Sequence, residues 1–189
     1  MTPRAHPHLS AYRRDGEWWL VDIRLRDVRQ LFETLDPAPF RERDLDPVAE
    51  TYLEDAVRDI GASRPIRLRV HLPAQDLESG LGRSLPEAIG RHFQFRAAQS
   101  AVELRRLLGR GATNLAIGLV FLGACLSARG SLPPGLRSGV LAEGLLIIGW
   151  VGLWRPVEIF LYDWWPIRRR QQRFAALAEM PVDVRVDES

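Results

Sequence analysis

The sequence contains no lysine: all 26 basic residues among its 189 positions are arginine. Schiff-base chemistry, Walker-type phosphate binding and kinase-type phosphoryl transfer each use a lysine amine, which a guanidinium cannot replace. The single cysteine, Cys125, excludes an intrachain disulfide and a cysteine-rich zinc site. No glycine-rich phosphate loop follows a predicted strand, and no nucleophile, base and orienting residue are grouped. We therefore expect no enzyme activity, no catalytic residue, no metal and no cofactor.

Two segments in the first half of the chain alternate between apolar and polar residues. They are 17–26, EWWLVDIRLR, and 65–72, PIRLRVHL. A period of two predicts half-buried strands, and the same pattern at 182–187 predicts a third. Between the first two strands, Asp46 followed by Pro47 suits the start of a helix, and Gly61 suits its end. This helical crossover predicts that the first two strands are parallel if they are adjacent.

Other helices are predicted on either side of the second strand. A short helix follows Asp27. A long one begins at Ser84, where Ser84 and Glu87 resemble a capping box. A loop is expected between the second strand and Ser84. Residues 1–16 lack the apolar core of a signal peptide and are interpreted as a flexible lead, in which His6 and His8 are solvated.

The composition changes after Arg110. Residues 112–128 carry no charge, and 138–154 carry only Glu143. Seventeen helical residues span about 26 Å, near the short limit for a bilayer core, so two buried helices of a soluble core are the alternative. A membrane is favoured because the segments are apolar all round and aromatic residues follow the second one. These aromatic residues are Trp150, Trp154, Tyr162, Trp164 and Trp165.

The predicted fold is α/β (or α+β): a small cytoplasmic domain with a three-stranded sheet and helices on one face, plus an inserted two-helix transmembrane hairpin. The expected boundaries are 17–108 for the domain, 109–167 for the hairpin and 168–189 for a helix and final strand that complete the domain. Eight arginines flank the hairpin, whereas its turn holds two. The positive-inside rule therefore predicts an inner-membrane, multi-pass protein with both termini cytoplasmic.

Small residues recur along both predicted spans. Ala112, Ala116, Gly123 and Ser127 share a face of the first, and Gly144 and Gly152 lie two turns apart on the second. Small residues let helices approach closely in lipid. The pattern leaves open whether they pack within one hairpin or between several copies.

Polar residues in and beside the spans are the first set of candidate site residues. Glu143 lies about one turn from the outer boundary and is interpreted as reaching the headgroups. Asn114 is expected at the depth of Trp154, with a hydrogen bond across the hairpin. Arg155 and Glu158 are one turn apart and can pair as an interfacial anchor, beside a kink at Pro156.

The polar faces of the strands are the second set of candidates. They carry Arg24, Arg67, Arg69, His71 and Arg185, balanced by Asp22, Asp183 and Asp187. Adjacent strands would turn them into a charge ladder. It is either a solvated face with cross-strand pairs or a docking surface for an acidic partner or anionic lipid headgroups. Nucleic acid is disfavoured because aromatic residues are not interleaved with these arginines.

Two further groups have structural explanations. The acidic residues of 36–50 could bind a hard cation, but capping and turn roles account for Asp36 and Asp46. The others are Glu42, Asp44 and Glu50. His92 adjoins the apolar face of the long helix beside Phe93 and is interpreted as a packed or interfacial histidine rather than a general base.

The features together predict a bacterial-type inner-membrane protein that acts as a membrane-anchored interaction, scaffold or regulatory module. Its expected partners are the lipid bilayer and a second copy or another protein. The alternative is a small oligomeric channel or transport accessory subunit with Glu143 near the pore. A membrane-bound enzyme is the third and least favoured class.

Overall fold

The computed structural model describes residues 12–33, 44–78, 80–133, 135 and 139–187. The chain divides into two compact units. The first combines Met1–Gln99 with Arg170–Ser189, and the second is Ser100–Arg169. The second unit is therefore an insertion in the sequence of the first.

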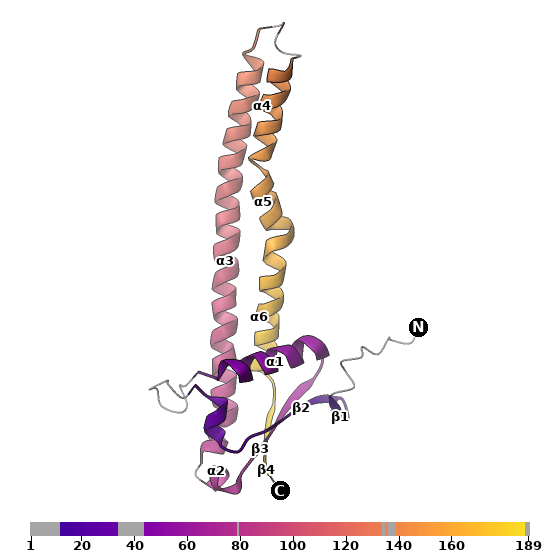
Figure 1. Ribbon diagram of the computed structural model, residues 1–189, viewed down its shortest axis with the longest axis vertical. Helices are drawn as coiled ribbons and strands as arrows, with labels where there is room; N and C mark the ends of the chain where they lie inside the picture. The colour runs from indigo at the N-terminus through magenta and orange to yellow at the C-terminus, as the bar shows by residue number, and fades with distance from the viewer. Residues whose placement is uncertain (1–11, 34–43, 79, 134, 136–138, 188–189) are drawn as a thin grey trace, which may run out of the picture. The chain divides into compact units, whose positions relative to one another are not determined.

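The first unit is built on a four-stranded sheet of order β1-β2-β3-β4 (Figure 1). Strand β2 (Trp18–Arg24) is parallel to β3 (Ile66–Leu72), which is parallel to β4 (Val182–Val186). This confirms the predicted parallel pairing and the predicted strand at the C-terminal end. The strand count was wrong by one, because β1 (Arg13–Asp15) pairs antiparallel with β2.

Strand β1 lies where the sequence suggested only a flexible lead. A two-residue turn at Gly16 and Glu17 lets the chain fold back, so that Asp15 lies opposite Trp18. Gly16 has a φ of 61°, a conformation that glycine adopts without a side-chain penalty. With only three residues and exposed side chains, β1 carries no apolar alternation from which it could be predicted.

One helix of the first unit agrees with its sequence prediction, and two differ from it. In α1 (Pro47–Ile60), the carboxylate of Asp46 accepts a 2.8 Å hydrogen bond from the N–H of Val48, and Gly61 follows the last turn, as predicted. The helix expected after Asp27 is a single 3-10 turn, η2 (Val28–Leu31). The expected loop contains a short helix, α2 (Ala74–Glu78).

The predicted capping box at Ser84 was wrong. Helix α3 (Leu81–Gly130) begins three residues earlier, and the Ser84 hydroxyl donates to the carbonyl of Leu81 at 3.0 Å. The serine therefore bonds backwards within the first turn instead of capping it.

One face of the sheet packs against α1, the start of α3 and the end of α6 (Trp164–Ala178). The inward residues of β3 are buried, whereas the alternate residues between them are only half-buried. These helices cover one face of the sheet, as predicted. The buried side chains that meet there include Val21, Leu68, Val70, Leu53, Val57, Ile89, Phe93, Phe174 and Leu177.

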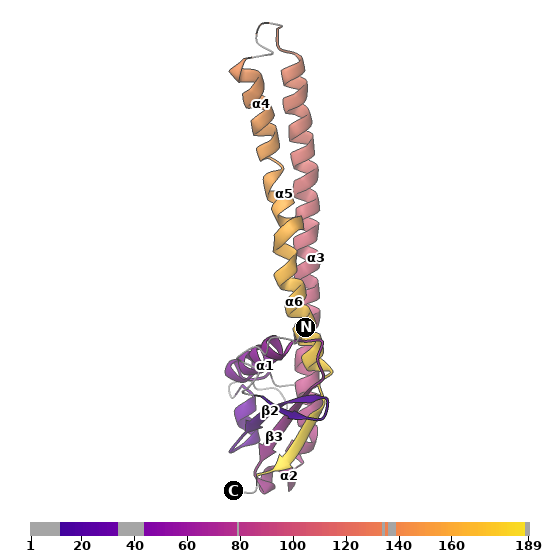
Figure 2. The ribbon, with the colours of Figure 1, turned by 90° about the vertical axis from the view of Figure 1, so that its right-hand side faces the viewer.

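The second unit is a hairpin of the later part of α3 and the helical run that contains α4 (Val140–Val151) and α5 (Trp154–Glu158). Figures 1 and 2 show these segments side by side. A π-helical segment, η3 (Ile159–Asp163), continues into α6. The run is interrupted at 152–153, because Pro156 lacks the N–H that would bond to the carbonyl of Gly152.

Small residues allow the two arms of the hairpin to approach closely. A Cβ atom added to Gly118 would lie 2.8 Å from the carbonyl oxygen of Gly152, and one added to Gly149 would lie 2.7 Å from Cδ1 of Leu122. Gly111 similarly approaches Ile159. The small residues predicted to pack either here or between copies, Ala112, Ala116, Gly123 and Ser127, are exposed in the hairpin.

Of the two alternatives, packing within one hairpin therefore does not apply to this set of residues, although Gly152 does lie in the seam. The seam residues Gly111, Gly118 and Cys125 repeat every seven positions, the spacing of closely packed antiparallel helices. The exposed small residues lie one or two positions from these seam residues in the sequence. They therefore face away from the second arm of the hairpin. Residue size alone did not distinguish between the two stripes.

Candidate functional site

The hairpin presents apolar side chains on its outside. Two helical runs, Leu81–Gly130 and Val140–Ala178, are long and apolar enough to cross a membrane. Within them Val120 is 76% exposed and Trp154 75% exposed. Many exposed large apolar side chains are unfavourable in water and typical of contact with lipid or another chain. Other exposed members are Ile117, Leu119, Phe121, Leu126, Val140, Leu141, Ile147, Ile148, Trp150, Val151, Leu161, Tyr162 and Trp165.

The predicted pair between Arg155 and Glu158 is formed, at 2.8 Å between Nη1 and Oε2. Arg155 has a second partner that was not predicted, because its Nη2 lies 3.3 Å from Oδ2 of Asp163. Regular α-helical spacing carried no direct signal for this contact, because eight positions are about 2.2 turns and a π-helical segment, Ile159–Asp163, ends at Asp163. One guanidinium is thus held by two carboxylates on the same side of the helix.

The predicted aromatic residues lie close to this cluster in sequence. Trp154, Tyr162 and Trp165 are exposed, whereas Trp164 is half-buried and donates from Nε1 to the carbonyl of Phe160 at 2.8 Å. The rings of Trp164 and Trp165 meet edge to face, with centroids 5.2 Å apart.

Asn114 and Glu143 are both exposed. The contacts of Gly118 with Gly152 and of Gly111 with Ile159 place Asn114 level with about residue 156, close to the depth expected. Within the described residues, however, no hydrogen bond joins Asn114 to the second arm. Glu143 lies in the first turn of α4, where a carboxylate interacts favourably with the helix dipole.

The strand register brings the five predicted basic residues of the sheet to one face. Arg69 lies 3.5 Å from Asp15 and 3.6 Å from Asp183, and His71 lies 3.5 Å from Asp22. The remaining three are also engaged: Arg24 with Asp187 at 3.3 Å, Arg185 with Asp183 at 3.0 Å, and Arg67 over the ring of Trp18 at 4.6 Å. The cross-strand pairs that the first interpretation required are thus present, and we call this surface the outer sheet face.

A polar cluster around the buried side chain of His92 was missed by sequence reasoning. The Nδ1 atom of His92 accepts a hydrogen bond from the N–H of Leu45 at 3.3 Å and lies 3.2 Å from Oδ1 of Asp44. Its Nε2 lies 3.2 Å from Oε2 of Glu50, whose other oxygen accepts from Nε of Arg96 at 2.7 Å. In the tautomer in which Nδ1 accepts from the N–H of Leu45, Nε2 donates to Glu50, and the 3.2 Å approach of Asp44 to Nδ1 is then not a hydrogen bond.

This cluster gives His92 the packed position that we expected and assigns roles to two of the acidic residues. Asp44 and Glu50 flank the imidazole, and Asp46 caps α1. No group of three or more metal-ligating side chains occurs among the residues that the structure describes. Asp36, Glu42, His6 and His8 lie outside those residues.

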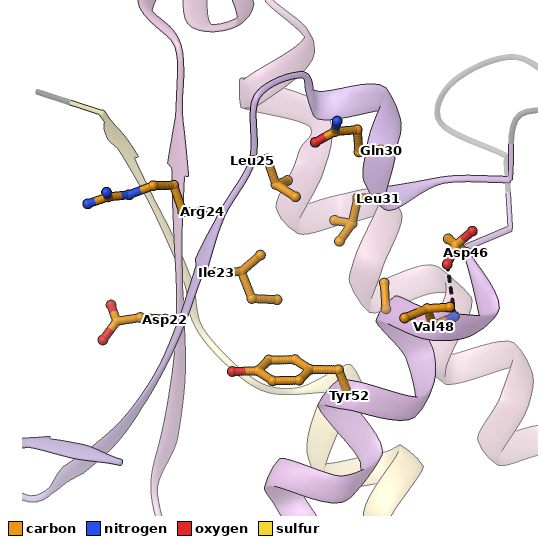
Figure 3. A pocket seen from close by; sticks show the side chains of 10 residues that line it. Asp22, Ile23, Arg24, Leu25, Gln30, Leu31, Asp46, Val48 and Tyr52 are labelled. Atoms are coloured by element: carbon orange, nitrogen blue, oxygen red, sulfur yellow. Dashed lines mark hydrogen bonds between the residues drawn. The ribbon is translucent and has the colours of Figure 1, made fainter. Parts of the chain in front are cut away.

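A pocket of about 390 Å³ lies between β2 and the first half of α1 (Figure 3). Ile23 of β2 and Leu25, the first residue after β2, point into the pocket, where Tyr52 of α1 also lies. Asp22 and Arg24 point away to the outer sheet face. Strand β1 pairs with β2 only from Trp18 to Leu20, so this part of β2 lies beyond the described ladder.

Comparisons with known protein families, with curated proteins and with solved structures gave no match to this chain.

Proposed function

We propose that this chain is a two-span inner-membrane protein, whose hairpin anchors a cytoplasmic α/β domain that acts as an interaction or regulatory module. The observation that carries the proposal is the apolar outside of the hairpin, where Val120, Val140 and Trp154 are each at least three-quarters exposed. Lipid tails would cover these side chains, whereas water would not.

The pairing of strands in the sheet supports a chain that crosses the membrane an even number of times. Strand β3 precedes the hairpin in sequence and β4 follows it, yet the two are hydrogen-bonded neighbours. The N–H of Asp187 also donates to the carbonyl of Leu72 at 2.8 Å. This pairing favours a hairpin whose two ends emerge on the same side of the membrane. The arginine bias, with Arg105, Arg106 and Arg110 before the hairpin, favours the cytoplasmic side.

Reporter fusions test this topology. We expect a reporter placed after residue 133 to be active only outside the cytoplasm and a reporter at the C-terminus only inside it. The full chain should resist extraction by alkaline carbonate. A cytoplasmic signal at residue 133, or release of the chain by carbonate, would contradict the proposal.

The outer sheet face supports the interaction role. Helices α1, α3 and α6 pack against the opposite face, and among the described residues charged side chains of the outer sheet face are exposed. The side chain of Arg24 is 69% exposed and that of Arg185 is 54% exposed, despite their ion pairs. We propose a second copy of the chain or another protein as the partner.

The mass of the intact complex in mild detergent tests this role. We expect a complex heavier than one 21.5 kDa chain, and we expect the double variant Arg24→Glu, Arg185→Glu to lose the added mass. The matched control is Arg58→Glu on α1, away from that face. A wild-type mass equal to that of one chain would contradict the role of the outer sheet face. An equal loss of mass in the Arg58→Glu control would contradict it as well.

For Glu143 we propose a position at the lipid headgroups. Its place in the first turn of α4 and its exposure support this position. Glu143→Gln should then change neither the complex mass nor the ion permeability of reconstituted vesicles. A conductance that the wild-type chain shows and Glu143→Gln abolishes would instead favour the channel alternative.

A further inference from the structure

One end of the hairpin carries arginines that no described carboxylate neutralises. Arg105, Arg106 and Arg110 lie on α3, Arg168 and Arg169 lie on α6, and all five are exposed. Within the described residues none of them forms an ion pair. Arg155, in the same unit, shows the contrast, because Glu158 and Asp163 both contact it. We call these five residues the arginine collar.

The register of the hairpin gathers the collar within about two and a half helical turns. Gly118 lies against Gly152 and Gly111 against Ile159, so paired positions in the two arms sum to about 270. Continuing this antiparallel register by two turns places Arg105 and Arg106 level with Trp164 and Trp165. Arg168 and Arg169 follow within one turn. Glu103 is the single acidic residue in the adjoining stretch 100–111 of α3.

The tryptophans hold two members of the collar. The guanidinium carbon of Arg168 lies 5.7 Å from the ring centroid of Trp164, and that of Arg169 lies 4.9 Å from that of Trp165. Stacking on a ring restrains a guanidinium while leaving its N–H donors free. Trp165 is itself 48% exposed, as expected for a ring at a membrane interface.

We infer that the arginine collar binds the headgroups of anionic phospholipids in the leaflet on its side of the membrane. A guanidinium donates two parallel hydrogen bonds to phosphate oxygens, and the collar's uncompensated charge favours a headgroup with net negative charge over a zwitterionic one. This inference rests on the proposed membrane insertion, and it specifies the class of lipid that the inserted chain binds.

The experiment measures which lipid stays bound. The full chain is purified in mild detergent, equilibrated with equal amounts of phosphatidylglycerol and phosphatidylcholine, and analysed by native mass spectrometry. We expect phosphatidylglycerol to be retained over phosphatidylcholine by at least about fivefold, the effect of a single basic residue near an anionic surface.

Variants assign that preference to the collar. Arg168→Gln with Arg169→Gln should reduce it at least about twofold, and adding Arg105→Gln with Arg106→Gln should bring it close to one. The first double variant changes no residue of α3. It therefore still tests the collar if the combined variant fails to insert into the membrane. Arg129→Gln, at the other end of the hairpin, is the matched control and should change nothing.

The outcomes separate this inference from the proposed function. Equal retention of both lipids by an integrated wild-type chain would overturn the inference and leave the anchor in place. An unchanged preference in the first double variant and the combined variant would also overturn it. Release of the wild-type chain by carbonate would instead contradict the proposed function itself.

Discussion

Arg173 in α6 donates two hydrogen bonds to a single oxygen of Glu54 in α1, from Nε at 3.1 Å and from Nη2 at 2.6 Å. The two residues are 119 positions apart, and the whole hairpin lies between them in sequence. Both side chains are about four-fifths buried, at 21% and 24% exposed. The pair thus ties the helix that returns from the hairpin to the helix that precedes it.

Replacing Arg173 should destabilise the first unit. Arg173→Met keeps much of the apolar stem but removes both hydrogen bonds from a mostly buried carboxylate, so we expect a loss of about 1–3 kcal/mol in the free energy of unfolding. Pulse proteolysis of the full chain in increasing urea measures it. The control is Arg58→Met, whose pair with Asp55 is exposed and should contribute less than about 0.5 kcal/mol. Equal losses in the two variants would show that the Glu54 pair has no special role.

The close approach at Gly118 predicts different effects at two glycines of one helix. Gly118→Ala places a methyl group against the carbonyl of Gly152, so the arms must separate, at a cost of about 1–3 kcal/mol. Gly123→Ala meets nothing within 4 Å and should leave the hairpin unchanged or slightly more stable. Thermal unfolding followed by circular dichroism in mild detergent compares them. If Gly123→Ala lowers the midpoint as much as Gly118→Ala, the seam is placed on the wrong face.

The His92 cluster should contribute more stability than the histidine on the outer sheet face. His92→Gln disturbs the hydrogen bonds to Leu45 and Glu50 in a buried site, and we expect a loss of about 1–3 kcal/mol. His71→Gln removes one 3.5 Å contact with half-exposed Asp22 and should cost less than about 1 kcal/mol. The free energy of unfolding in urea distinguishes the two. A larger loss for His71→Gln would contradict the structural role of His92.

Tyr12 predicts a loss of stability at alkaline pH. Burial raises the pKa of Tyr12 above its ordinary value of 10.0, and the nearby carboxylate of Asp59 adds to this rise. Because the fold favours the neutral phenol, its stabilisation is complete below the unfolded-state pKa and is lost as the pH rises through the higher folded-state pKa.

The free energy of unfolding should therefore fall more steeply above about pH 10 in the wild-type chain than in Tyr12→Phe. Ultraviolet titration of tyrosinate provides an independent measurement, since the variant should lose the tyrosine that titrates at elevated pH. Parallel stability curves for the two proteins would show that Tyr12 does not couple to folding.

Much of the fold could be predicted because its signals are local. The alternation in 66–72 depends only on neighbouring residues, and so does the Asp46-Pro47 start of α1. The charge on the outer sheet face was also predictable, because strand period and residue type together decide which side chains share a face. Strand β1 was missed because its pairing depends on a turn at Gly16 rather than on a pattern of its own.

The sequence by itself determined the three longer strands, helix α1, the apolar hairpin and the fact that every basic side chain other than histidine is a guanidinium. Tertiary structure alone decided which glycines face the second arm, and it joined Glu54 to Arg173 and His92 to Glu50. The reason is physical. The periodicity of apolar residues is a property of a single segment. It shows which face of that segment is buried, but not which other segment packs against it. Close packing and the pairing of buried polar groups depend on two segments at once, and these contacts exist only when the chain has folded.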